Sequence, residues 1–176
     1  GDFVREPRRL LAVARQGAGE ALPPAAGRCA LNDVVIHPRS RARLLELDLY
    51  GPAGFICHYR ADGLIIATPT GSTAYALAAG GPILQSTLRA LTLVPICPQS
   101  MTNRPIVVPD SCEIEILITK ADNARVHCDG QSHIDLHSMN RLTIRRYRNT
   151  LRVLHPTNYQ YYKTLRQKLH WGEQLV

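Results

Sequence analysis

Residues 61–83 read A-D-G-L-I-I-A-T-P-T-G-S-T-A-Y-A-L-A-A-G-G-P-I and decide how the chain is organised. Within them, residues 64–67 form a short apolar run rich in β-branched side chains, which predicts a buried strand. Residues 68–71 break that strand, Ser72 is a good N-cap residue, and residues 80–82 end the helix that follows. A strand, a hydroxyl-rich turn and a helix N-terminus predict a cradle for a nucleotide or another anion, because free backbone N–H groups converge there.

Turn residues divide the rest of the chain into short apolar segments. Residues 45–49 (L-E-L-D-L) alternate strictly, as a half-buried strand does, and pair with residues 55–59 in a predicted hairpin. The predicted strands are residues 31–36, 45–49, 55–59, 64–67, 91–96, 106–108, 114–118, 125–128, 133–136, 142–146 and 151–154. Helices are predicted at residues 72–79 and 159–169, whereas residues 3–16 are helical or extended and residues 17–27 form a loop. The predicted fold class is mainly β: a β-sandwich of short strands with one internal helix after the T-P-T-G-S-T-A-Y turn and a C-terminal helix.

The composition is that of one globular domain. The chain has 176 residues, of which 45% are hydrophobic and 20% charged, enough to bury a core of its own. No window is apolar enough to span a membrane, so no membrane association is expected. The chain begins Gly1-Asp2-Phe3, without an initiator Met or a signal peptide, and we interpret this start as a cut inside a longer protein.

The net charge of +7 raises the question of nucleic-acid binding. The basic residues lie in separate clusters and no aromatic residues interleave with them, which favours a solvated surface with a few arginines facing a polyphosphate ligand. No nucleic-acid partner is therefore expected.

The five cysteines are scattered, odd in number and contain no C-x-x-C pair. This pattern favours reduced thiols and a cytoplasmic location. A zinc site from Cys57-His58 and His127-Cys128 stays open, although that spacing matches no common ligand pattern.

Three places carry side chains suited to a nucleotide. Asn32 and Asp33 offer an amide and a carboxylate side by side, which can grip ribose hydroxyls or an adenine amino group, although both residues also form turns. Asp62 lies just before the buried strand, where it could accept a hydrogen bond from a ligand or simply form an Asp-Gly turn. Tyr75 offers a ring for stacking and a hydroxyl, or fills the core of an amphipathic helix.

The order T-P-T-G-S-T-A-Y at residues 68–75, with A-L-N-D-V-V at 30–35 and D-G-Q at 129–131, resembles the signature of the NAD kinases, the ATP- or polyphosphate-dependent enzymes that phosphorylate NAD. The resemblance covers essentially the whole chain but only the C-terminal part of that family. It implies three parts. Residues 1–26 are an entry segment and loop that lead in from an N-terminal α/β domain missing from this chain. Residues 27–156 are a β-sandwich NAD-binding domain, and residues 157–176 are a C-terminal helix and tail.

The resemblance also implies a set of substrate-binding residues. Asp33 stands where the family often has Glu, and Arg43 is the loosest match. The implied NAD- or nucleotide-binding residues are Asn32, Asp33, Arg43, Arg60, Asp62, Thr70, Thr73, Ala74, Tyr75, Ala76, Leu77, Ala78 and Gln131.

The family's G-G-D-G motif, whose Asp is its presumed general base, is absent from this chain. The resemblance therefore implies no catalytic residue and no metal ligand here, and a fragment that is inactive alone. For the intact enzyme it implies Mg²⁺ or another divalent cation, NAD and ATP or polyphosphate as substrates, and a homodimer or homotetramer.

Two alternatives stay open. One is a related lipid or diphosphate kinase of the same superfamily, which would need a long apolar groove. The other is a non-catalytic nucleotide-binding or oligomerisation module. No P-loop, G-x-G-x-x-G or G-x-S-x-G motif occurs to suggest another chemistry.

Overall fold

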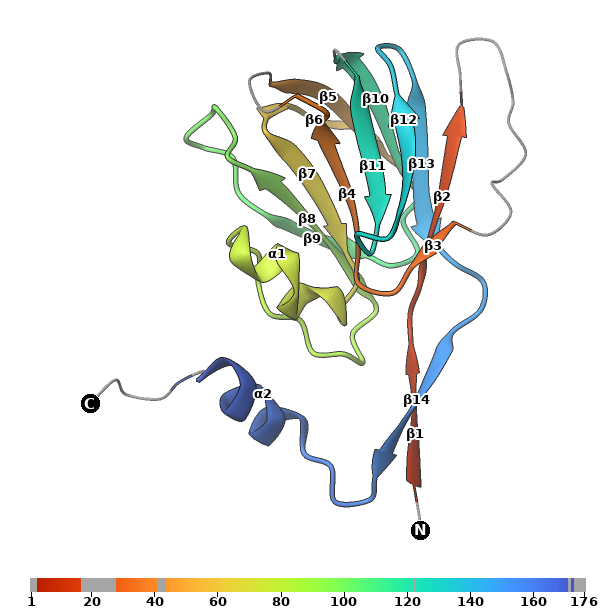
Figure 1. Cartoon of the computed structure of the whole chain (residues 1–176), viewed down its shortest axis with the longest axis vertical. Helices are drawn as coiled ribbons and strands as arrows, with labels where there is room; N and C mark the ends of the chain where they lie inside the picture. Colours follow the sequence, from red (N-terminus) through yellow and green to blue (C-terminus); the bar gives the residue numbers. More distant parts are fainter. Residues whose placement is uncertain (1–2, 17–27, 41–43, 122, 171, 173–176) are drawn as a thin grey trace. The chain divides into compact units, whose positions relative to one another are not determined.

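A computed structural model describes residues 3–16, 28–40, 44–121, 123–170 and 172. The chain divides into two compact units (Figure 1). The larger unit spans residues 8–151, and the smaller unit joins residues 1–7 to residues 152–176.

In its described residues, the larger unit contains two six-stranded sheets in which neighbouring strands pair antiparallel. The first sheet has the order β3 (Cys29–Ala30), β2 (Leu11–Gln16), β13 (Arg141–Arg146), β10 (Ile114–Lys120), β5 (Leu45–Gly51) and β6 (Gly54–Ala61). The second sheet has the order β12 (Ser132–Leu136), β11 (Ala124–Cys128), β4 (Asp33–Pro38), β7 (Gly63–Ala67), β8 (Ala90–Ile96) and β9 (Ile106–Pro109). The predicted mainly β fold is confirmed.

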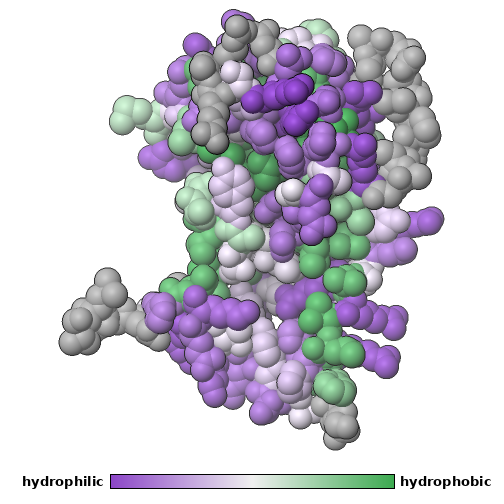
Figure 2. All heavy atoms as spheres, in the orientation of Figure 1, coloured by the Kyte–Doolittle hydropathy of each residue, from purple (hydrophilic) through white to green (hydrophobic). Residues whose placement is uncertain are grey.

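The sandwich core lies between the two sheets and follows from alternation along each strand. In β5, Leu45, Leu47 and Leu49 are fully buried while the residues between them are partly exposed. Across the pair with β10, Ile116 lies opposite Leu49, so the apolar faces coincide. Figure 2 shows hydrophilic side chains over most of the visible face of this unit, as expected when the large apolar side chains face inward.

The central strands of the second sheet are buried on both faces. Val34 and Ile36 of β4 belong to the sandwich core, whereas Val35 points the other way. On that outer face a second apolar cluster joins Val35 to four residues of the neighbouring strands and of α1 (Tyr75–Ala78): Ile65, Ala67, Ala76 and Val94. A strand run without polar residues, such as residues 64–67, is explained by this two-sided burial.

The internal helix is shorter than the sequence predicts. A 3₁₀ turn, η1 (Gly71–Thr73), and the single turn α1 are separated by Ala74, whose backbone angles (φ −99°, ψ −131°) are not helical. The prediction of Ser72 as N-cap is wrong. Its hydroxyl is fully buried, donates to the Pro69 carbonyl at 2.7 Å and accepts the Leu84 N–H at 2.9 Å, so it fastens two loop segments together.

The smaller unit contains α2 (Tyr161–Leu169) and all but one end residue each of β1 (Phe3–Arg8) and β14 (Leu151–Pro156), which pair with each other. The extended alternative for residues 3–16 is therefore correct, and the predicted C-terminal helix is confirmed with a start two residues later. His155 stacks on Tyr159 at 3.9 Å and contacts the Glu6 carboxylate at 3.1 Å. Among the described helices, none combines the length and apolar character needed to cross a bilayer.

Candidate functional site

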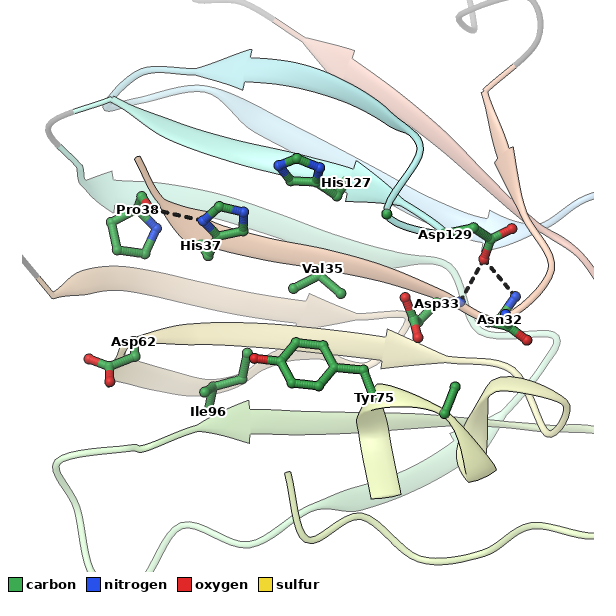
Figure 3. A pocket seen from close by; sticks show the side chains of 12 residues that line it. Asn32, Asp33, Val35, His37, Pro38, Asp62, Tyr75, Ile96, His127 and Asp129 are labelled. Carbon is green, nitrogen blue, oxygen red and sulfur yellow. Dashed lines mark hydrogen bonds between the residues drawn. The ribbon is translucent and has the colours of Figure 1, made fainter. Parts of the chain in front are cut away.

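A cavity of about 770 Å³ opens on the outer face of the second sheet (Figure 3). Its floor includes Val35 of β4 and Ile96 at the end of β8. Loops and turns from distant parts of the sequence complete it. The lining residues are Asn32, Asp33, Val35, His37, Pro38, Asp62, Ala74, Tyr75, Ile96, His127, Asp129 and Gly130.

The Asp129 carboxylate fixes one end of the cavity. It accepts backbone N–H groups from Leu31 at 2.7 Å, Asn32 at 2.8 Å and Asp33 at 3.1 Å. The Asp129 N–H in turn donates to the Asp33 carbonyl at 3.0 Å, and Asp129 itself has a left-handed φ of 49° that Asp tolerates. Charge-assisted bonds of this kind hold Asn32 and Asp33 in place.

Asp33 is a buried carboxylate beside another carboxylate. Its exposed fraction is 6%. Burial, and then the negative charge of Asp129, raise its pKa from 3.8 to about 6. At neutral pH the Asp33 carboxyl group is therefore largely ionised, although burial and the neighbouring charge make the ionised form unfavourable in free energy. A hydroxyl or amino group of a ligand that donates a hydrogen bond to it would offset this unfavourable free energy.

The raised pKa of Asp33 predicts that Asp33→Asn stabilises the chain at high pH. A carboxyl group with a raised folded pKa favours folding most below its unfolded value of 3.8, and that contribution is lost as pH rises through about 6. We expect the variant to gain about 1–3 kcal/mol over the parent at pH 8 and little at pH 4. Urea unfolding at pH 4, 6 and 8 measures this, and parallel stability–pH curves for the two proteins would contradict it.

Two turns are locked together beneath the cavity. Thr68 is buried; its hydroxyl donates to the Leu31 carbonyl at 2.6 Å and accepts the Gly71 N–H at 3.1 Å. Its own N–H donates to the Asn32 carbonyl at 2.9 Å. A Cβ atom at position 71 would lie 2.6 Å from the Asn32 Cα and closer still to its carbonyl group. Only glycine at position 71 lets the two backbones come this close. The close contact positions the following residues, Ala74 and Tyr75, at the cavity.

Tyr75 and Asp62 approach the cavity from the side opposite β11. Figure 3 shows the Tyr75 ring lying along the cavity with its hydroxyl near Ile96, and 48% of Tyr75 is exposed. Asp62 is exposed, and its N–H donates to the Ile96 carbonyl at 2.9 Å, which anchors it to the end of β8. A half-exposed ring and a carboxylate on a fixed backbone are both accessible to a ligand.

The cavity brings together Asn32, Asp33, Asp62, Ala74 and Tyr75 among the residues that the sequence predicts for binding. Others lie outside its lining. The Arg60 side chain pairs with Glu46 at 3.6 Å, the Thr73 hydroxyl donates to the Thr70 carbonyl at 3.3 Å, and Ala76 is buried in the outer apolar cluster. The remaining members outside the lining are Thr70, Leu77, Ala78 and Gln131. Arg43 lies outside the described residues.

Sequence reasoning missed several lining residues. Val35 and His37 follow from alternation, since they face away from the core residues Val34 and Ile36. Asp129 belongs to the D-G-Q segment of the resemblance, but nothing local to it indicates its hydrogen bonds to residues 31–33. The others are Pro38, Ile96, His127 and Gly130.

Fold and cavity together define a β-sandwich domain with a cavity on one outer face that both apolar and polar side chains line. The family model described as the ATP-NAD kinase C-terminal domain matches residues 31–155. The chain is 57% identical over 176 residues to the NAD kinase of Neisseria meningitidis serogroup C and 54% identical over 178 residues to that of Chromobacterium violaceum. It is matched over its full length and spans 58% and 60% of those proteins.

Two solved structures share the fold. Yeast NADH kinase complexed with NADH superimposes with a TM-score of 0.89 at 27% identity, covering 98% of this chain and 50% of that one. An NAD kinase from Archaeoglobus fulgidus in complex with ATP gives a TM-score of 0.75 at 27% identity, covering 94% and 59%. The chain belongs to the NAD kinase family, as its C-terminal domain.

Proposed function

We propose that this chain is the substrate-binding part of an enzyme that phosphorylates the adenosine 2′-hydroxyl of NAD to make NADP, with ATP or polyphosphate as donor. The observation that carries the proposal is the cavity in which Asn32, Asp33, Asp62 and Tyr75 meet. Asn32, Asp33 and Tyr75 come from the segments by which the sequence resembles NAD kinases, and Asp62 is among the binding residues that the resemblance implies. The volume of about 770 Å³ lies within the range of about 300–1,000 Å³ typical of small-molecule sites.

The lining residues suit a dinucleotide. The Asp33 carboxylate would accept hydrogen bonds from ribose hydroxyls or an amino group, and the Asn32 amide can both donate and accept. The exposed face of Tyr75 would stack on a base. The NADH bound to the yeast relative supports a nicotinamide dinucleotide as the ligand class.

The phosphoryl transfer itself would be performed outside this chain. The sequence contains no G-G-D-G, and in the described residues no group of three or more His, Cys, Asp or Glu side chains is arranged to hold a metal ion. The divalent cation would then neutralise the donor phosphates, while residues of this chain bind and orient NAD. We expect the chain alone to make no NADP from NAD, ATP and Mg²⁺. A coupled assay that detects NADP well above a protein-free blank would contradict the assignment of phosphoryl transfer to residues outside this chain.

Three further parts of the proposal follow from the sequence. Residues 1–26 would lead in from an N-terminal α/β domain, residues 27–156 would form the NAD-binding sandwich, and residues 157–176 would form the C-terminal helix and tail. The intact protein would be a homodimer or homotetramer. A cytoplasmic location is supported by the five cysteines, all of which are free.

Substitution of Asp62 or Tyr75 tests the proposed site. We expect Asp62→Ala to weaken NAD binding about 10- to 150-fold, because a charge-assisted hydrogen bond contributes about 1.5–3 kcal/mol. Tyr75→Ala should weaken binding more than Tyr75→Phe, which keeps the ring. Isothermal titration calorimetry with NAD measures both effects.

Tyr162→Ala is the matched control, since Tyr162 lies on α2 with an exposed fraction of 53%, close to the 48% of Tyr75. Melting temperatures of all four variants should stay near that of the parent, because these side chains add little to packing. Equal NAD affinity in the Asp62 and Tyr75 variants and the parent would refute the assignment of the site.

A further inference from the structure

The charged side chains that line the cavity are negative, as is the dinucleotide that the proposed function assigns to it. Three carboxylates, Asp33, Asp62 and Asp129, line the cavity, and its described lining contains no Lys or Arg. A dinucleotide carries two negative phosphates. Among the described lining side chains, those of His37 and His127 are the ones that can become cationic.

These two histidines lie face to face on neighbouring strands. The rings of His37 (β4) and His127 (β11) are 4.8 Å apart and nearly parallel, at 15°. His133 of β12 continues the row, with its ring 5.7 Å from that of His127. Figure 3 places the stacked pair along the wall that joins Asn32 and Asp129 to Pro38. Both rings of the pair thus face the cavity from a rigid sheet.

The hydrogen bonding of His37 defines its tautomer. Its Nδ1 lies 2.9 Å from the Pro38 carbonyl oxygen, which can only accept, so Nδ1 carries the proton. The other ring nitrogen, Nε2, is then a lone-pair acceptor when the ring is neutral and becomes a donor when the ring is protonated. Protonation converts this side chain from one that repels a phosphate oxygen into one that binds it.

The surroundings disfavour the protonated form of His127 when no ligand is bound. Burial, followed by His37, His133 and Arg125, lowers the pKa of His127, and only Asp135 opposes them. Arg125 lies opposite His37 in the pairing of β11 with β4, and it pairs with Asp135 of β12 at 2.6 Å, so this neighbouring cation is already engaged. Two adjacent imidazolium rings would repel each other, and an anion between or beside them would offset that repulsion.

We propose that the stacked His37 and His127 rings form a phosphate-binding subsite of the cavity, which takes up a proton when a diphosphate-bearing dinucleotide binds. The inference rests on the proposed function. It assigns the phosphate contact to two residues that lie outside the signature motifs. The proton comes from solution and adds to one imidazole, so no bond to the ligand forms or breaks. The phosphate charge then stabilises the imidazolium, and binding and protonation favour each other.

Calorimetry with two ligands tests the subsite. NAD and adenosine are each titrated into the chain at pH 6, 7 and 8, in buffers of different ionisation enthalpy, so that the observed heat reports the protons taken up. NAD binding is expected to take up a substantial fraction of one proton at pH 7 and to weaken about tenfold or more between pH 6 and pH 8. Adenosine, which lacks phosphate, is expected to show neither effect. Any pH dependence that comes from Asp33 would appear with both ligands.

Histidine variants locate the proton. His127→Gln and His37→Gln should each reduce proton uptake and flatten the pH dependence for NAD. His133→Gln, in the same row but outside the cavity lining, should keep a pH dependence of the same size, displaced to higher pH because His133 no longer lowers the pKa of His127. In the parent chain, the imidazole C2 proton resonances should titrate at a higher pH with saturating NAD than without it. This NMR measurement needs no substitution and so does not depend on how the variants fold.

Two failures can be told apart. NAD binding that depends on Asp62 and Tyr75 but takes up no proton, or takes it up equally in both glutamine variants, would overturn the histidine subsite and leave the proposed function standing. Absence of NAD binding to the parent chain would overturn both.

Discussion

Gly71→Ala is expected to destabilise the chain by about 3 kcal/mol or more, which exceeds the usual cost of about 1–3 kcal/mol for overpacking a core. The new methyl group would occupy the position of the Asn32 backbone, with the Asn32 Cα only 2.6 Å away. A flexible side chain could rotate out of the way, but this backbone is held by Thr68 and Asp129. Relief therefore requires separating the 28–33 and 68–73 turns, which also opens the cavity. Urea unfolding monitored by circular dichroism measures the loss.

Gly51→Ala is the matched control. A Cβ atom at Gly51 would meet only the end of the Ile56 side chain, at 3.2 Å, and that chain can shift. We expect a change below about 1 kcal/mol for this substitution. Equal stability of the two alanine variants would show that the turns are not locked as described.

Asp129→Asn is the second substitution with a large expected effect. Asn keeps the shape and the tolerance of a left-handed φ, but it replaces one acceptor oxygen by an NH₂ group that faces backbone donors. Three N–H groups then share one neutral acceptor, and we expect a loss of about 2–4 kcal/mol in the free energy of unfolding. Removing the neighbouring charge should also lower the pKa of Asp33 toward its ordinary value.

Glu113→Gln provides the comparison. Glu113 is exposed and pairs with Arg145 at 3.7 Å, and such surface pairs contribute about 0–1 kcal/mol. Chemical denaturation of both variants at pH 7, with NMR titration of the Asp33 carboxyl carbon, measures the two effects. A loss for Asp129→Asn no larger than for Glu113→Gln would mean that the carboxylate does not organise the cavity.

The fold could be predicted because its strands carry local signals. Alternation in residues 45–49 and 114–118 defines one buried face per strand, and that is sufficient to predict two packed sheets. The continuous apolar run at 64–67 is buried on both faces, which periodicity alone cannot distinguish from a short helix. Its flanking turn residues resolved that ambiguity.

The errors arose where distant segments decide the structure. Ser72 has the sequence position of an N-cap, yet its hydroxyl bonds to Leu84, twelve residues on, and the helix starts beyond Ala74. Asp129 acts on residues almost a hundred positions earlier, and His37 and His127 meet only because β4 pairs with β11. Pairing of distant strands cannot be deduced from one sequence without knowledge of the register.

We expect NAD to bind in the cavity on the outer face of the second sheet. Following the backbone amide resonances of the ¹⁵N-labelled chain during a titration with NAD tests it most directly. The expected result is a saturable change concentrated at Asn32, Asp62, Tyr75 and Gly130, with little change on the outward side of the first sheet, for example at Glu115 or Thr143. Saturable changes centred on the first sheet, or no saturable change at the four cavity residues, would show that NAD does not bind in this cavity.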